Sequence, residues 1–284
     1  MKLVAGPSSQ LLAARIARTG GFSLVPMEYE RFPDGEGYVR VCEDITGRDV
    51  AVVQTVRCDQ DMVSLLQLID ACEEASKLLV VMPYMGYARQ DRRFKQGEPI
   101  SSRAVARCIH SDVVMLINVH NERVLDYFNC DVHSLDASSA LAAHIAGMGI
   151  EDAVFIAPDG GAVELAKVAA GAIGASYDHL EKKRLSPDSV VIAPKSVDVE
   201  GRQVVLIDDI VSTGGTMAGA IEMLLEQGAS GVHVACVHPV FVKNAVVRLF
   251  VAGAEKLVFT DTIEAHGGSV SVAPLIAREL RMIK

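Results

Sequence analysis

The segment Val204-Val205-Leu206-Ile207-Asp208-Asp209-Ile210-Val211-Ser212-Thr213-Gly214-Gly215-Thr216 places an apolar run before two adjacent acids and a loop of small residues. The apolar run predicts a buried strand, and the loop predicts a helix beginning at about Thr216. Backbone N–H groups and hydroxyls at a helix N-terminus favour an anion. Paired carboxylates can accept hydrogen bonds from sugar hydroxyls, so the segment predicts a phosphorylated-sugar site at the carboxyl edge of a parallel sheet. The alternative, a helix cap with a turn, needs no adjacent acids.

Apolar runs alternate with helical stretches along the chain, which predicts mostly parallel sheets covered by helices. Similar segments recur at an offset of 152 to 156 residues. The paired positions are Ala5 and Ala157, Gly47 and Gly201, and Pro83 and Pro239. We therefore expect two copies of one α/β domain, spanning 1–138 and 139–284. The apolar stripe of 273–282 predicts a helix that packs back on the N-terminal domain.

Composition excludes several classes of protein. The chain has 284 residues, of which 50% are hydrophobic and 22% charged, and these proportions predict a folded core. A net charge of −9 and the absence of tryptophan disfavour nucleic-acid binding. No apolar run approaches the length of a membrane span. The six cysteines form no Cys-x-x-Cys pair, so we expect buried free thiols and a cytoplasmic protein.

The Asp208–Thr216 loop resembles the phosphoribosyl-pyrophosphate (PRPP) loop of type I phosphoribosyltransferases and ribose-phosphate pyrophosphokinases. Further segments resemble the pyrophosphokinases. They are Arg31-Phe32-Pro33-Asp34-Gly35-Glu36, Pro83-Tyr84-Met85-Gly86-Tyr87-Ala88-Arg89-Gln90-Asp91-Arg92, His238–Phe241 and Thr260–Ile263. The resemblance covers essentially the whole chain and implies two tandem type I phosphoribosyltransferase-like domains. It also implies transfer of the β,γ-pyrophosphoryl group of ATP to the 1-hydroxyl of ribose 5-phosphate, giving PRPP and AMP for nucleotide biosynthesis.

The resemblance implies an ATP site on the first copy. Its residues are Phe32, Asp34, Glu36, Arg89, Gln90, Asp91 and Arg92. The first three lie on a turn that, in the family, reaches the adenine of a neighbouring subunit, which implies a homo-oligomer. Arg89 and Gln90 would contact phosphate and base, while Asp91 and Arg92 could instead pair and fix the loop. Without the resemblance, an ordinary turn and a solvated run of charge are the alternatives.

The resemblance assigns ribose 5-phosphate and the metal to other residues. Asp208 and Asp209 would hold the ribose hydroxyls. The 5-phosphate would be held by Ser212, Thr213, Gly214, Gly215 and Thr216. His120 and Asp159 would bind Mg²⁺, partly through water. A structural or surface histidine and an N-cap aspartate are the alternatives for these two residues.

The basic run after Glu181 matches the mobile flap of the family at Lys182 and Arg184. These side chains would neutralise charge as the α–β phosphoanhydride bond breaks. Taken alone, such a run is typical of a solvated surface. Three positions depart from the family pattern. Ser212 and Asn118 stand where many members carry aspartate, and Gly215 stands where they often carry alanine.

Other functions remain as alternatives. A phosphoribosyltransferase would consume PRPP and would need no ATP site. A non-catalytic, PRPP-synthetase-associated subunit should carry damaged flap or metal residues, and here those residues match the family. The chain ends at Lys284, which the resemblance interprets as a short form without the longer C-terminal tail. Allosteric control and the number of subunits beyond a dimer are left open.

Overall fold

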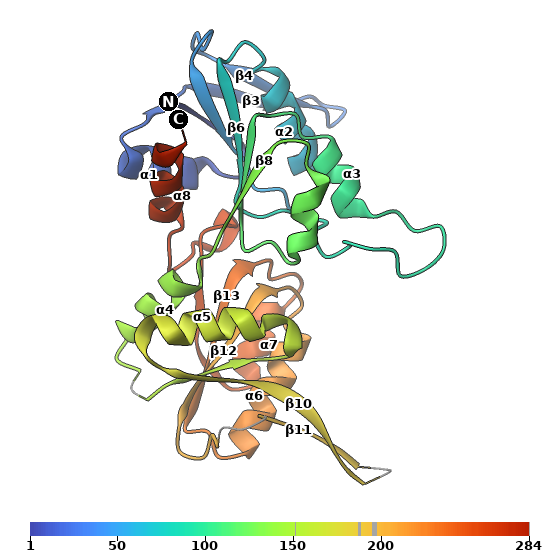
Figure 1. The fold of residues 1–284 in the computed structure, drawn as a ribbon, viewed down its shortest axis with the longest axis vertical. Helices are drawn as coiled ribbons and strands as arrows, with labels where there is room; N and C mark the ends of the chain where they lie inside the picture. The colour runs from blue at the N-terminus through green and yellow to red at the C-terminus, as the bar shows by residue number, and fades with distance from the viewer. Residues whose placement is uncertain (151, 187–188, 195–197, 284) are drawn as a thin grey trace. The chain divides into compact units, whose positions relative to one another are not determined.

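The computed structural model describes residues 1–150, 152–186, 189–194 and 198–283, without the side chains of 182–197. The chain divides into two compact units (Figure 1). Unit 1 comprises Met1–Asp136, Thr262–Gly267 and Ser271–Lys284, and unit 2 comprises Ala137–Asp261 and Gly268–Val270. Each unit is built around one six-stranded sheet.

Unit 1 contains a sheet in which every pairing is parallel, with strand order β2-β1-β5-β6-β7-β8. Its strands are β1 (Lys2–Ala5), β2 (Ser23–Leu24), β5 (Asp49–Val53), β6 (Lys77–Met82), β7 (Val113–Ile117) and β8 (Asp131–Leu135). The flanking helices are α1 (Gln10–Gly20), α2 (Asp59–Asp70), α3 (Ser101–Arg107) and α8 (Ala273–Met282), with 3-10 helices η1 (Glu122–Tyr127) and η3 (Glu264–His266). A separate antiparallel hairpin consists of β3 (Met27–Arg31) and β4 (Gly37–Val41).

Unit 2 has the strand order β11-β10-β9-β12-β13-β14. Its strands are β9 (Val154–Ala157), β10 (Ser176–Ser186), β11 (Ser189–Pro194), β12 (Gln203–Val211), β13 (Gly231–Pro239) and β14 (Ala254–Phe259). All pairings are parallel except that of β10 with β11. Its helices are α4 (Ser138–Ala146), α5 (Val163–Ile173), α6 (Gly215–Glu226) and α7 (Ala245–Val251), and η2 (Gly160–Ala162) follows β9.

The two units share one strand order, which confirms the duplicated α/β fold expected from the sequence. Strands β2-β1-β5-β6-β7 of unit 1 correspond in order and direction to β10-β9-β12-β13-β14 of unit 2. The central strands are nearly continuous apolar runs because helices pack on the sheets, and each unit has its own buried cluster. Burying one leucine or valine of such a strand contributes roughly 1.5–3 kcal/mol.

The C-terminal helix α8 belongs to unit 1. The Arg281 guanidinium donates hydrogen bonds to the carbonyls of Thr19 (2.6 Å) and Gly20 (3.2 Å) at the end of α1. On the same helix, Glu279 Oε1 lies 2.7 Å from His133 Nδ1 of β8. The C-terminal helix is therefore hydrogen-bonded to the unit that contains the N-terminus of the chain.

The cysteine expectation was wrong for three residues. Cys72 and Cys236 are buried, but Cys42, Cys58 and Cys108 are exposed. Cys58 and Cys108 flank helices, where the chain turns at the surface, and Cys42 follows the hairpin. All six thiols are free.

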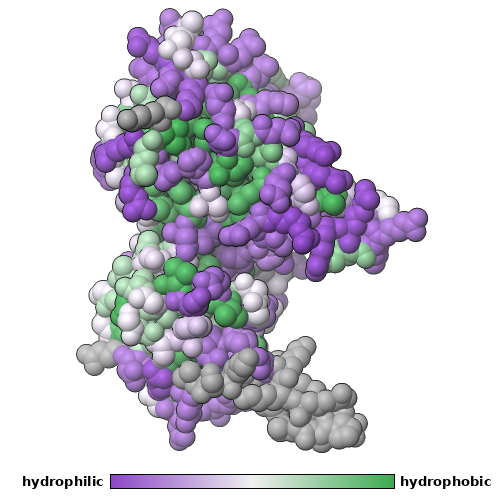
Figure 2. Space-filling view, in the orientation of Figure 1, coloured by the Kyte–Doolittle hydropathy of each residue, from purple (hydrophilic) through white to green (hydrophobic). Residues whose placement is uncertain are grey.

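The visible surface of both units carries mainly hydrophilic side chains, with apolar residues in smaller groups between them (Figure 2). Among the described residues, no helix has the length and apolar character that a membrane crossing requires. The apolar residues of the chain instead lie largely in the sheets and the helix faces against them.

Candidate active site

The two acids of the Asp208–Thr216 segment lie on β12 itself, where this strand continues beyond its shorter neighbour β9. Strand β12 pairs with β9 from Val204 to Leu206, but with β13 as far as Val211. The strand expected to end at 207 therefore continues to 211, because β13 supports it on one side. Asp208 and Asp209 consequently stand at the carboxyl edge of the sheet, beyond the end of β9.

Three carboxylates converge at this edge. Burial and, secondarily, the neighbouring carboxylates of Asp209 and Asp159 together raise the pKa of Asp208 to about 8. The Asp209 amide donates to Asp208 Oδ1 at 2.9 Å, which partly opposes this rise. Carboxylates forced together in this way attract hydrogen-bond donors or a cation. The edge is therefore suited to a polyhydroxylated ligand accompanied by a positive charge.

The loop after β12 is held through its carbonyl groups. The bonds run from Phe241 N to Val211 O (3.0 Å), from Val242 N to Ser212 O (3.1 Å) and from Arg248 Nη1 to Thr213 O (3.1 Å). These donors all follow β13, so the neighbouring strand and α7 fix the loop. Arg248 was not identified from the sequence, because nothing in the pattern indicates that α7 reaches a loop 35 residues earlier.

The start of α6 presents backbone N–H groups at the end of the loop. Gly214 has φ 72°, a left-handed conformation that glycine adopts without strain. The first N–H groups of α6 have no acceptor within the helix, and the helix dipole points its positive end at this place. Thr213, Gly215 and Thr216 are exposed beside them. An added Cβ at Gly215 would make only ordinary contacts, at 3.5 Å or more.

Asp159 lies two residues beyond β9. Its Oδ1 accepts a hydrogen bond from Gly161 N at 2.8 Å and caps η2. Asp159 therefore has the capping role that was the alternative interpretation. Its carboxylate also contributes to the raised pKa of Asp208. One residue can do both, because capping uses one carboxylate oxygen.

The Phe32–Glu36 segment forms the tip of the β3–β4 hairpin in unit 1. The tip is closed by bonds from Phe32 N to Glu36 O (2.8 Å) and from Glu36 N to Asp34 Oδ1 (3.2 Å). Phe32 is 47% exposed and meets Tyr38 edge to face, with ring centroids 6.2 Å apart. An aromatic ring displayed on an ordered turn can stack against a flat ligand.

The four residues of the loop after β6 that were predicted to bind ATP, Arg89 to Arg92, differ in their exposure. Arg89 and Arg92 are exposed, whereas Asp91 is buried. Asp91 Oδ2 accepts from Asn121 Nδ2 at 2.7 Å, and its carbonyl accepts from Tyr127 at 3.0 Å. Asp91 therefore fixes this loop through Asn121, which lies on another loop, whereas the alternative left open from the sequence was pairing with Arg92.

Gln90 and Arg92 each have a local contact. The Ser101 hydroxyl donates to the Gln90 side chain, and Ser102 Oγ donates to the Gln90 carbonyl at 3.1 Å. The guanidinium of Arg92 lies 5.2 Å from the ring centroid of Phe94. Arg89 is one of the exposed bases of this loop, and Gln90 is positioned by the start of α3.

His120 is exposed, three residues beyond β7 in unit 1. The nearby Asn118 has φ 35°, and its Nδ2 donates to Asp136 Oδ1 at 2.8 Å. An aspartate at 118 would place its carboxylate beside that of Asp136, whereas the asparagine amide donates to it. Within the described residues, no three histidine, cysteine, aspartate or glutamate side chains form a metal-holding group.

Lys182 and Arg184 lie outside the residues whose side chains the structure describes. Their backbone belongs to β10, which pairs with β11 at Lys182 and Ile192 and at Arg184 and Val190. The expected flap is thus a β-hairpin that extends the sheet of unit 2.

Comparison with known proteins identifies the family. The model of the N-terminal domain of ribose phosphate pyrophosphokinase matches residues 1–112, and the phosphoribosyl transferase domain matches 132–279. The ribose-phosphate pyrophosphokinase of Methanosarcina mazei is 52% identical over 280 residues, covering 99% of this chain and 95% of that protein. Ribose-phosphate pyrophosphokinase 2 of Archaeoglobus fulgidus is 41% identical over 282 residues, covering 99% and 100%.

A solved structure agrees over the same length. The crystal structure of phosphoribosylpyrophosphate synthetase from Mycobacterium smegmatis superposes with a TM-score of 0.88 at 30% identity, covering 99% of this chain and 98% of that one. The two matched domains, the full-length relatives and the shared fold together show that this chain belongs to the ribose-phosphate pyrophosphokinase family.

Proposed function

We propose that this protein transfers the β,γ-pyrophosphoryl group of ATP to the 1-hydroxyl of ribose 5-phosphate, giving PRPP and AMP. The observation that carries the proposal is the convergence of paired acids with the start of α6 at the edge of unit 2. Membership of the family, whose relatives bear the name ribose-phosphate pyrophosphokinase, supports it. PRPP is a precursor for nucleotide biosynthesis, so the product defines the cellular role.

Ribose 5-phosphate would bind along the β12–α6 segment. Asp208 and Asp209 accept hydrogen bonds from the 2- and 3-hydroxyls of the ribose, which relieves part of the repulsion between the acids. The 5-phosphate lies against the hydroxyls and N–H groups of 212–216, where the dipole of α6 favours its charge. Ser212 supplies a hydroxyl and an N–H group and no second negative charge.

ATP would bind through unit 1. Arg89 contacts a phosphate and Gln90 the base, while Asp91 acts indirectly by holding the loop to Asn121. The hairpin tip with Phe32, Asp34 and Glu36 reaches the adenine of a neighbouring subunit. This arrangement requires a homo-oligomer, a dimer or larger, because one chain would not complete its own adenine site.

The donor set fits Mg²⁺. Magnesium prefers oxygen ligands, keeps several waters and is usually held by one or two carboxylates together with substrate phosphates. The acids near Asp159 offer such oxygens, and the raised pKa of Asp208 indicates a place where positive charge is favourable. Asp159 and His120 would hold the ion, which when bound neutralises phosphate charge.

The chemical step needs no covalent intermediate on the protein. The 1-hydroxyl attacks the β-phosphorus as the bond between the β-phosphorus and the α–β bridging oxygen breaks, so AMP leaves with that oxygen. Lys182 and Arg184 on the β10–β11 hairpin neutralise the charge that develops on the transferred group and on AMP. Positioning and charge neutralisation therefore supply most of the acceleration.

A direct assay tests this proposal. The purified protein is incubated with ATP, ribose 5-phosphate and Mg²⁺, and AMP and PRPP are quantified by ion-exchange chromatography. We expect equal amounts of both products, none without ribose 5-phosphate, and strong reduction in Asp209→Asn. Absence of AMP would reject the kinase and leave a PRPP-consuming transferase or a non-catalytic subunit as the remaining functions.

A further inference from the structure

The β5–α2 segment of unit 1 corresponds to the β12–α6 segment of unit 2 but is shorter as a whole. Strand β5 begins at Asp49 and α2 at Asp59, whereas β12 begins at Gln203 and α6 at Gly215. Counted from the start of the strand to the start of the helix, the segment in unit 1 is therefore two residues shorter. The glycine pair is also absent, and Arg57 and Asp61 occupy this part of the chain instead.

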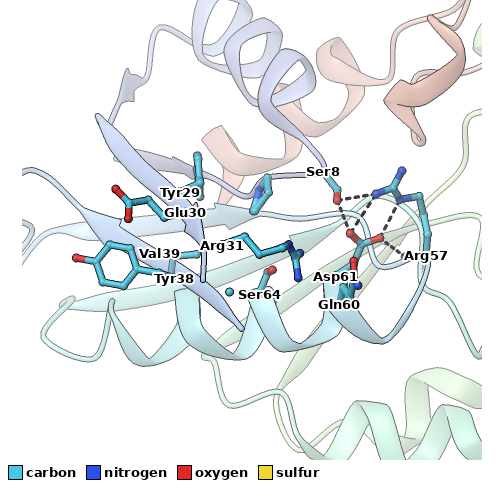
Figure 3. Close-up of a pocket in the computed structure, with 12 residues that line it drawn as sticks. Ser8, Tyr29, Glu30, Arg31, Tyr38, Val39, Arg57, Gln60, Asp61 and Ser64 are labelled. Carbon is cyan, nitrogen blue, oxygen red and sulfur yellow. Dashed lines mark hydrogen bonds and ion pairs between the residues drawn. The ribbon is translucent and has the colours of Figure 1, made fainter. Parts of the chain in front are cut away.

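The Asp61 carboxylate is surrounded by hydrogen-bond donors (Figure 3). Its Oδ2 accepts from Arg57 N at 2.9 Å and from Arg57 Nε at 2.8 Å. Its Oδ1 accepts from Arg57 Nη2 at 3.1 Å and from the hydroxyl of Ser8. A carboxylate has about four acceptor positions, and four donors meet this one. Asp61 is only 6% exposed, so its charge is neutralised within the fold.

These donors are the kinds that bind phosphate. They are a backbone N–H group just before a helix, a guanidinium in fork geometry and a hydroxyl from the loop after β1. Burial acts to raise the pKa of Asp61, but the bonds from Arg57 and Ser8 outweigh it and keep the pKa below its ordinary value. The carboxylate is consequently a permanent anion at this place.

We propose that Asp61 fills, with its own carboxylate, the anion position that the equivalent loop of unit 2 leaves open to a ligand. The loop of unit 1 is therefore a closed anion site, and this charge excludes inorganic phosphate and phosphorylated ligands from it. Removing the carboxylate opens the site. The inference concerns unit 1 alone and does not rest on the reaction proposed above.

A phosphate ion could reach the site once the carboxylate is gone. Arg57, Asp61 and Ser8 line a cavity of about 410 Å³ beneath the β3–β4 hairpin (Figure 3). The side chain of Arg57 is 41% exposed. Without Asp61, the Arg57 N–H group and Nε lose their carboxylate partner, while Nη2 keeps its bond to Ser8 Oγ at 2.9 Å. The freed donors face this cavity and are available to an external anion.

The test counts inorganic phosphate bound per chain by equilibrium dialysis of the full-length protein with ³²P-labelled phosphate. We expect Asp61→Ala to bind one more phosphate per chain than the wild type. The double variant Arg57→Ala/Asp61→Ala should return to the wild-type number, because the principal donor is gone. Asp70→Ala is the matched control, since it removes an exposed acid from the other end of α2 and should add no phosphate.

Unit 2 is unchanged in every variant, so any phosphate that it binds is the same in all of them. The difference in bound phosphate between a variant and the wild type therefore reports on unit 1 alone. An Asp61→Ala protein that melts cooperatively but binds no additional phosphate would overturn the inference. Loss of a bound phosphate from the otherwise wild-type chain on Arg57→Ala would also overturn it, because the site would then be open already. If Asp61→Ala does not fold, the Arg57→Ala arm and Asp61→Ser, whose shorter side chain also vacates the position and is expected to gain the same phosphate, decide the question.

Discussion

Replacing Asp208 by asparagine should remove a pH-dependent loss of stability in the metal-free protein. The pKa of Asp208 is raised from 3.8 to about 8, first by burial and then by Asp209 and Asp159. A raised pKa means that the folded chain holds a proton that the unfolded chain has already released. Asp208 therefore favours folding most below pH 4, and this contribution is lost as the pH rises through about 8.

The size of the effect follows from linkage. While Asp208 is protonated only in the folded state, the free energy of unfolding falls by about 1.4 kcal/mol for each pH unit. Between pH 6 and pH 8 the loss amounts to about 2 kcal/mol, because the folded group itself becomes half ionised near pH 8. For a chain of this length, that corresponds to about 4–8 °C in Tm.

Thermal unfolding at pH 6 and pH 8, with a chelator present, measures this quantity. Asp208→Asn should show a decrease in Tm between the two pH values that is smaller by about 4–8 °C than in the wild type. Glu222→Gln, which removes an exposed acid from α6, should behave as the wild type. An unchanged pH dependence in Asp208→Asn would refute the claim that Asp208 is protonated near neutral pH.

Three further changes test other parts of the structure. Lys182→Ala should lower kcat by roughly 10³-fold with little change in the KM for ATP, whereas Lys183→Ala should retain turnover; near-normal kcat in the former would exclude its role. Gly86→Ala should destabilise unit 1 by about 1–3 kcal/mol, measured by urea unfolding, because the new Cβ would lie 2.6 Å from a backbone carbonyl oxygen. Asn118→Asp should lower Tm at pH 7 but not at pH 3, since its carboxylate would face Asp136; equal losses at both pH values would contradict this repulsion.

The sequence was sufficient to predict features that depend on local pattern. The apolar run before Asp208, the glycine pair and the amphipathic helix that follows predict a strand, a loop and a helix, because each signal lies within a few residues. The duplication was also predictable, since equivalent strands recur at a nearly constant offset. The extension of β12 to Val211 was not, because it depends on pairing with β13.

Contacts between distant residues could not be predicted from one sequence. Asp91 and Asn121 are 30 residues apart, and neither neighbourhood indicates the other. Ser8 and Asp61 meet because the ends of β1 and β5 are adjacent in the sheet, a relation that the strand order alone reveals. The roles of Lys182 and Arg184 rest on the resemblance to the family.

The fate of the β-phosphorus of ATP tests the central claim most directly. ATP labelled with ³²P at the β-position is incubated with the protein, ribose 5-phosphate and Mg²⁺, and the nucleotide and sugar products are separated. Transfer of an intact pyrophosphoryl group predicts that all transferred label is found in PRPP, with one unlabelled AMP formed for each PRPP. Labelled ADP together with unlabelled ribose 1,5-bisphosphate would contradict the account, because it would show transfer of the γ-phosphoryl group alone.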